Sequence, residues 1–310
     1  MKINVTQGSI KTLEIFADTI KTAIEATYGE DYKVSTSKVN KTNDVEFTGI
    51  SISHKNSNIA PVIYLDEFFK DYQNGVPLEL ICKRVIEIYK NNKISFDVSY
   101  ITDFEKIKND ICYKIINTDR NKKLLSNVPY IEIKDLSIVF YILINEKSLE
   151  GQGSITVSNE MLKKWNVDIN TLKKVAFYNT EKKFKASICS MEDTLRELMA
   201  LSYCEDEYFV SDFAKEVPMF VCSNTQKVNG ACVFIYKNLL QTLARKLDSD
   251  IYILPSSIHE TILIPVNAGM DINHLKGMVK EINSFAVAPN EILSDNVYCY
   301  NRAANKINIE

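Results

Sequence analysis

The sequence lacks features that would mark a membrane or exported protein. No apolar run approaches the ~18 residues that a membrane-spanning helix needs, and the start, Met1-Lys2-Ile3-Asn4, has no apolar signal core. The seven cysteines are an odd number, widely spaced, and contain no Cys-x-x-Cys pair. This pattern is typical of reduced, buried thiols and not of a disulfide framework or a zinc cage. We therefore expect a cytoplasmic protein without membrane association.

Signatures of metal and cofactor sites are also missing. The three histidines lie in separate segments, and none has a second histidine at the spacing of helical metal ligands. Gly151 and Gly153 lack the third glycine of a dinucleotide fingerprint, and no Gly-x-Ser-x-Gly elbow is present. The sequence predicts neither a metal ion nor a cofactor.

The charge balance gives no general attraction to polyanions. The net charge is -3 and the pI is about 5.8, and the lysine pairs alternate with acids, which is typical of solvated helix faces. Nucleic acid is not an expected partner. The sequence leaves the oligomeric state open.

The apolar patterning predicts an α+β protein. Helical spacing marks residues 10–28, 78–89, 102–117, 159–165, 168–184, 190–201, 239–247 and 271–282. Strand patterning marks residues 32–36, 45–52 with a bulge at Gly49, 61–64, 131–133, 138–144, 219–222, 231–236, 251–254 and 261–266. We expect two lobes, residues 1–150 and 151–310, each with antiparallel hairpins covered by helices. Two glycines close together at residues 150–154 mark the joint.

The densest polar cluster follows Leu254. Ser256, Ser257, His259 and Glu260 lie between the apolar segments 251–254 and 262–264. Such groups must bond to one another, to water or to a ligand, because burying them unpaired costs several kcal/mol. This is the candidate functional site of the chain.

Two interpretations of this cluster remain open. In the first, the serines hold the turn through hydrogen bonds to the backbone, His259 pairs locally with Glu260, and any further role is contact with a ligand or partner. In the second, Ser257 and His259 serve a small hydrolase or transferase with Glu260 or a remote acid, although residues two apart on a strand are too distant for direct activation. Cys222 is a further nucleophile candidate beside His259, but it ends an apolar strand and is expected to be a packed thiol.

A second polar loop, residues 224–230, contains Asn224 and the turn pair Asn229-Gly230. If the two hairpins pair side by side, both loops form one surface, and loops on a rigid scaffold commonly carry recognition. The predicted binding residues are therefore Asn224, Asn229, Ser256, Ser257, His259 and Glu260.

Several separated motifs run through the whole chain. They are Ala60-Pro61 with Tyr64-Leu65, Thr102-Asp103-Phe104, Arg120-Asn121 with Leu124-Leu125, Trp165 with Val167, Asn179-Thr180, Asn224 with Gly230-Ala231, Leu254 to Ser257 with His259-Glu260, and Leu293-Ser294-Asp295 with Val297-Tyr298. On these motifs nearly the whole chain resembles an uncharacterised domain-of-unknown-function family, numbered fifty-six eighty-eight, common in anaerobic gut Firmicutes. The resemblance implies a bacterial cytoplasmic or mobile-element protein and carries no catalytic residue.

Because no catalytic, cofactor or phosphate signature is complete, the sequence favours a non-enzymatic protein-binding or adaptor module. The hydrolase or transferase centred on Ser257 and His259 is the alternative.

Overall fold

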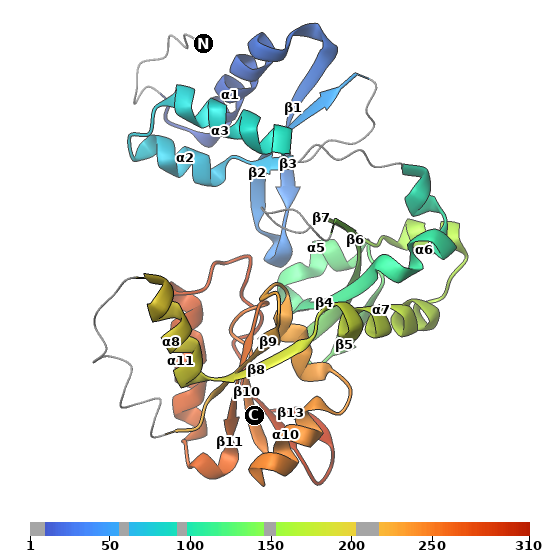
Figure 1. Cartoon of the computed structure of the whole chain (residues 1–310), viewed down its shortest axis with the longest axis vertical. Helices are drawn as coiled ribbons and strands as arrows, with labels where there is room; N and C mark the ends of the chain where they lie inside the picture. The colour runs from blue at the N-terminus through green and yellow to red at the C-terminus, as the bar shows by residue number, and fades with distance from the viewer. Residues whose placement is uncertain (1–9, 56–61, 92–97, 146–152, 203–216) are drawn as a thin grey trace. The chain divides into compact units, whose positions relative to one another are not determined.

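A computed structural model describes residues 10–55, 62–91, 98–145, 153–202 and 217–310 (Figure 1). These residues form two compact units. Apart from the gaps named above, the first contains residues 10–41 and 45–106, and the second contains residues 42–44 and 107–310. The expected lobe boundary at residues 150 and 151 lies outside the described residues, so the division at that point stays a prediction.

The first unit is a three-stranded antiparallel sheet packed against three helices. Its elements are α1 (Leu13–Tyr28), β1 (Tyr32–Asn40), β2 (Glu46–His54), β3 (Val62–Tyr64), α2 (Asp66–Gln73) and α3 (Leu78–Asn91), with the strand order β1-β2-β3. Thr12 caps α1, and Gly29 ends it with φ 69°. The core joins the apolar stripes of α1 and α3 to Val34, Ile50 and Ile52 on one face of the sheet.

The predicted bulge at Gly49 is wrong. The pairing of β1 with β2 runs without interruption from Tyr32 opposite His54 to Asn40 opposite Glu46. The apolar phase changes because Phe47 uses the other face of the sheet, where its ring lies 5.7 Å from that of Tyr64. Gly49 serves a close approach instead, since a Cβ there would lie 2.3 Å from Val62 Cγ1.

The second unit begins with a sheet covered by helices. Its elements are β4 (Ile111–Asn117), α5 (Lys122–Leu125), β5 (Tyr130–Ile133), β6 (Leu136–Asn145), β7 (Gly153–Thr156), α6 (Asn159–Trp165) and α7 (Ile169–Lys183). The short helix α4 (Phe104–Ile107) spans the point in the chain at which the two units divide. The strand order is β4-β6-β5, and β7 also pairs with β6. Helix α7 packs on β4, where the Tyr113 and Phe177 rings stack at 4.4 Å. The Thr180 hydroxyl accepts a hydrogen bond from the Tyr113 N–H at 3.0 Å.

The helix expected over residues 102–117 is wrong in its second half. Only α4 is α-helical there, and residues 111–117 form β4. Every residue of β4 except Lys114 is buried, because β6 pairs with β4 and α7 covers it. Strands buried on both faces carry continuous apolar residues, which also satisfy a helical spacing.

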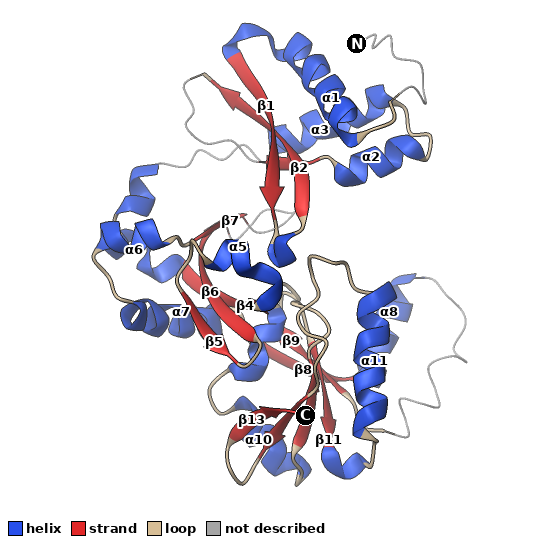
Figure 2. Cartoon of the chain, turned by 180° about the vertical axis from the view of Figure 1, so that it is seen from behind, coloured by secondary structure: helices blue, strands red, loops and turns tan. Residues whose placement is uncertain are grey.

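A six-stranded antiparallel sheet completes the second unit. Its elements are β8 (Ala186–Ser190), α8 (Met191–Ser202), β9 (Phe220–Asn224), α10 (Leu239–Leu247), β10 (Ile251–Leu254), β11 (Thr261–Pro265), α11 (Ile272–Phe285), β12 (Tyr298–Asn301) and β13 (Lys306–Ile309). The strand order is β13-β12-β10-β11-β9-β8. Helix α11 packs Leu275 and Val279 against Met219, Leu254 and Ile264 of the sheet region (Figure 2).

The sheet differs from expectation at four places. Residues 231–236 were expected to be a strand, but Gly230–Ile235 form a 3-10 helix that is largely buried. Strands β8, β12 and β13 are not predicted from the sequence, because each is only four or five residues long. The predicted α+β class is confirmed.

The helices of the described residues include none that is both long enough and apolar enough to span a membrane.

Candidate functional site

The two polar loops do lie together at one end of the six-stranded sheet. Strand β9 pairs with β11, with Cys222 opposite Thr261, so the loop that follows β9 meets the loop that precedes β11. Ser223 donates a hydrogen bond to the carbonyl oxygen of His259 at 2.7 Å, and the Ala231 N–H donates to the carbonyl oxygen of Ile258 at 3.2 Å. The two loops are therefore in direct contact at this end of the sheet.

The segment of residues 255–258 is fixed by pairing with residues 291–294. The N–H groups of Leu293 and Ser294 donate to the carbonyl oxygens of Ser256 and Pro255, and Ser257 forms an isolated bridge with Ile292. Extended backbone segments held in this way keep their side chains in fixed directions. The loop is thus a rigid part of the sheet end.

Ser257 is nearly buried, and its hydroxyl holds the local turn. Its exposed fraction is 5%, and its Oγ accepts the backbone N–H of His259 at 3.0 Å. A hydroxyl that accepts an N–H two residues later closes a side-chain turn. Ser256 beside it is half-buried.

Both ring nitrogens of His259 face protein groups. Its Nδ1 accepts the N–H of Asn229 at 3.3 Å, and its Nε2 lies 3.6 Å from Glu291 Oε1. Because Nδ1 acts as an acceptor, the proton of the neutral ring is assigned to Nε2, facing the carboxylate. The acid beside His259 is therefore Glu291, and not its neighbour Glu260 as the local pairing predicted.

The buried side chain of Asn224 holds the loop of residues 224–230 through hydrogen bonds to its backbone. It is 2% exposed, its Nδ2 donates to the Val228 carbonyl at 2.8 Å, and its Oδ1 accepts the Gln226 N–H at 2.9 Å. Asn229 takes the left-handed conformation, with φ 50°, which asparagine tolerates better than most residues. The predicted binding residues Asn224 and Asn229 thus shape the loop through a buried amide and a turned backbone.

A pocket of about 360 Å³ opens beside His259. Its lining residues come from both loops and from the segment after α11, and they are Lys227, Ser257, His259, Glu260, Ala286, Val287 and Glu291. The pocket places a cation, an imidazole and two carboxyl groups together. Such a set suits hydrogen-bonding recognition of a polar partner group.

Cys222, the alternative nucleophile, is buried in β9. Its exposed fraction is 0%, and burial raises the pKa of the thiol to about 12. Since the thiolate is the nucleophile, a thiol with this pKa is inert at neutral pH. The buried position agrees with a packing role.

A second polar network, not recognised from the sequence as a site, lies around Asp135. One carboxylate oxygen accepts hydrogen bonds from the Ser294 hydroxyl at 2.6 Å and Asn296 Nδ2 at 3.0 Å. The other oxygen accepts from the Tyr298 hydroxyl at 2.6 Å. Burial first, and then the Asp135 carboxylate, raises the pKa of Tyr298. Nothing in the local sequence at Asp135 indicates this role, because its partners lie about 160 residues away along the chain.

The network continues to Asp295. Its carboxylate accepts hydrogen bonds from Asn283 Nδ2 at 2.8 Å and from Arg120 at 2.7 Å. Burial alone would raise the pKa of Asp295, but these two hydrogen bonds and the Arg120 charge outweigh it and lower the pKa. The motif residues Arg120 and Ser294-Asp295 therefore join the two sheets of the second unit.

Within the described ranges, no three His, Cys, Asp or Glu side chains are grouped so that they could hold a metal ion.

The sequence profile of DUF5688, a family of unknown function, matches residues 13–302. The chain belongs to this family. Comparison with curated proteins and with solved structures gives no match. Membership in DUF5688 assigns no function, so the roles of this DUF5688 chain rest on its own geometry.

Proposed function

We propose that this DUF5688 protein is a non-enzymatic protein-binding or adaptor module of the bacterial cytoplasm. It binds its protein partner through a surface around His259. This His259 surface consists of the pocket residues Lys227, His259, Glu260 and Glu291 and of the exposed apolar residues Val228, Ile282 and Phe285. The observation that carries this proposal is the bonding of Ser257 and His259. The Ser257 hydroxyl and the His259 ring both accept hydrogen bonds from backbone N–H groups of the two loops.

Three exposed apolar residues lie close in the chain to the residues that line the polar pocket. Phe285 is 73% exposed, Ile282 is 38% exposed and Val228 is 36% exposed. Phe285 and Val228 directly neighbour pocket-lining residues in the chain, and Ile282 lies one turn before Phe285 on α11. Large apolar side chains beside polar groups are typical of protein interfaces, where aromatic residues anchor the contact.

The cytoplasmic location has separate support from the thiols. Within the described residues, Cys82, Cys222 and Cys232 are buried thiols that form no disulfide. Free buried thiols are usual in reducing compartments, while exported proteins tend to pair their cysteines.

The test uses the intact protein with a photo-crosslinking residue in place of Phe285, expressed in a native bacterial cytoplasm. The matched control carries the same residue in place of Tyr178, another exposed aromatic residue, at 67% exposure on α7. We expect a defined protein to crosslink at position 285 and not at position 178. That protein, once purified, should bind the wild-type chain and lose about tenfold or more in affinity against Phe285→Ala.

The double variant His259→Ala, Glu260→Ala should weaken the same complex, while Tyr178→Ala should leave it unchanged. Absence of any specific crosslinked partner at position 285 would remove the proposal. Turnover of a substrate that disappears in both Ser257→Ala and His259→Ala would instead establish the hydrolase or transferase alternative.

A further inference from the structure

Strand β8 forms one edge of the six-stranded sheet. It pairs with β9 along Ala186–Ser190, and within the described part of the chain no strand pairs with its other side. An edge strand offers a row of backbone N–H and C=O groups to which another chain can pair.

The pairing pattern shows which residues of β8 face outward. The Thr225 N–H donates to the Lys185 carbonyl at 2.9 Å, and the Met191 N–H donates to the Met219 carbonyl at 2.8 Å. Both pairs follow the register in which Ile188 lies opposite Cys222. Because hydrogen-bonded and non-hydrogen-bonded positions alternate in antiparallel strands, Ala186 and Ile188 direct their backbone groups away from β9.

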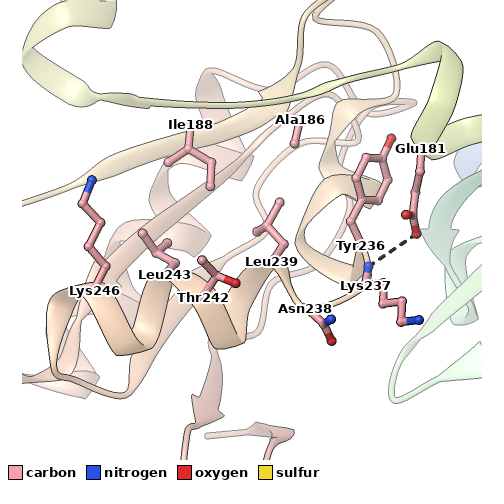
Figure 3. Close-up of a pocket in the computed structure, with 10 residues that line it drawn as sticks. All are labelled: Glu181, Ala186, Ile188, Tyr236, Lys237, Asn238, Leu239, Thr242, Leu243 and Lys246. Carbon is pink, nitrogen blue, oxygen red and sulfur yellow. Dashed lines mark hydrogen bonds between the residues drawn. The ribbon is translucent and has the colours of Figure 1, made fainter.

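A groove of about 420 Å³ lies between this edge and α10. Figure 3 shows the side chains of Ala186 and Ile188 directed toward Leu239 and Leu243 of α10. These four side chains are exposed or half-buried. The groove thus combines open backbone groups on one wall with apolar side chains on the other.

The charges at the groove are mainly positive. Lys237 and Lys246 are exposed lining residues at opposite ends of the groove (Figure 3), and neither has an ion-pair partner within the described ranges. Glu181 is the one carboxylate of the lining, and its Oε1 accepts the Lys237 N–H at 3.4 Å. Lys185, next to Ala186, is also exposed. The arrangement is complementary to acidic side chains on either side of an apolar one.

We propose that an extended peptide segment of another protein binds here as an additional strand on β8. Its backbone pairs with Ala186 and Ile188, an apolar side chain enters between Ile188, Leu239 and Leu243, and flanking Asp or Glu side chains meet Lys237 and Lys246. Strand addition of this kind takes affinity from backbone pairing and specificity from pockets for alternate side chains. The groove shares no lining residue with the pocket at His259, so each site can be tested without the other.

The experiment selects peptides from a random displayed library against the intact chain. We expect enrichment of sequences with an apolar residue between acidic ones. One enriched peptide is then synthesised with single backbone N-methyl groups. In an added strand, the N–H groups of alternate residues face β8. A single methyl group on one of these nitrogens should abolish binding, and a single methyl group on one of the nitrogens that face away should be tolerated.

Variants of the chain locate the peptide. Leu243→Lys and the double variant Lys237→Glu, Lys246→Glu should each weaken binding by about tenfold or more. Ala186→Pro removes an N–H that does not bond to β9, and proline is accepted at an edge or at the start of a strand, so it should weaken binding without unfolding. Ser187→Ala, on the opposite face of β8, is the matched control and should bind normally.

The charge variants change exposed lysines only, so their effect does not depend on whether the apolar variant folds. Enrichment of no peptide, enrichment of peptides without acidic residues, or insensitivity to the position of the N-methyl group would each overturn the proposal. If the wild-type chain forms a dimer and Ala186→Pro dissociates it, then the partner at this edge is a second copy of the chain. That result would also overturn the proposal.

Discussion

The Ser223 hydroxyl donates to the carbonyl oxygen of His259 at 2.7 Å, beside the backbone of Gly230. A Cβ on Gly230 would lie 2.2 Å from Ser223 Oγ and 2.6 Å from the His259 oxygen. Three segments therefore meet at a point that has no room for a side chain. This contact holds the two polar loops in one surface.

Gly230→Ala should lower the free energy of unfolding by about 2 kcal/mol, because the added methyl group must displace backbone and a buried hydrogen bond. Urea unfolding measures the change. The control is Gly277→Ala on α11, where an added Cβ meets nothing within 4 Å. Since alanine is a better helix former than glycine, the control should be stabilised by roughly 0.5–1 kcal/mol. Equal effects at both positions would contradict the close contact.

Asp135→Ala should lower the free energy of unfolding by about 3 kcal/mol. The substitution removes the acceptor of three hydrogen bonds, from Ser294, Asn296 and Tyr298, and bonds to charged acceptors are the stronger ones. Tyr298→Phe, which removes one of the three, should cost about 1 kcal/mol. An exposed acid in the same unit, Asp119, has 80% side-chain exposure, and Asp119→Ala should change stability by less than about 0.5 kcal/mol. A small effect at Asp135 in urea unfolding would contradict the network.

Asp295 should contribute to the loss of stability in acid. Its pKa in the folded protein lies below the ordinary value of 3.8, so folding favours the charged carboxylate. The contribution of Asp295 to the free energy of unfolding is complete above the pKa that this carboxyl has in the unfolded chain. It is lost as the pH falls through the lower pKa that the carboxyl has in the folded protein. In urea unfolding across this range, Asp295→Asn should show a shallower decline than the wild type. The same decline in both proteins would show that Asp295 gains nothing from Arg120 and Asn283.

Cys222 and Cys232 should resist alkylation in the folded protein. Burial raises the pKa of each thiol to about 12, and their exposed fractions are 0% and 1%. Iodoacetamide near neutral pH, followed by peptide mass spectrometry, should label neither until the protein is unfolded in urea. Rapid labelling of native Cys222 would instead support a nucleophile beside His259.

Local patterns were sufficient where an element carries its own signals. Helix α1 combines an apolar stripe with a Thr12 cap and Gly29 at its end, and Asp271 caps α11 in the same way. The β1–β2 hairpin follows from alternation and a polar turn. In each case the deciding interactions lie within one turn or one strand, so the sequence window contains them.

Local patterns were insufficient where burial comes from distant segments. Strand β4 carries apolar residues at a helical spacing, but it pairs with β6 and packs against α7 and the 3-10 helix Gly230–Ile235. Residues 231–236 have a composition typical of a strand, yet Gly230–Ile235 form a 3-10 helix. In both places the spacing of apolar residues is compatible with a helix and with a strand, and contacts with distant segments decide between them.

The α+β class, most helices and the polar character of the loops that precede β11 and follow β9 could be predicted from the amino-acid sequence. It also located His259 and Asn224 as residues that need partners. The partners themselves depend on the folded chain, because Glu291 and Asp135 meet His259 and Tyr298 through contacts between segments remote in the sequence. Hydrogen bonds and charges act over a few ångströms in space, and distance along the chain carries little information about them.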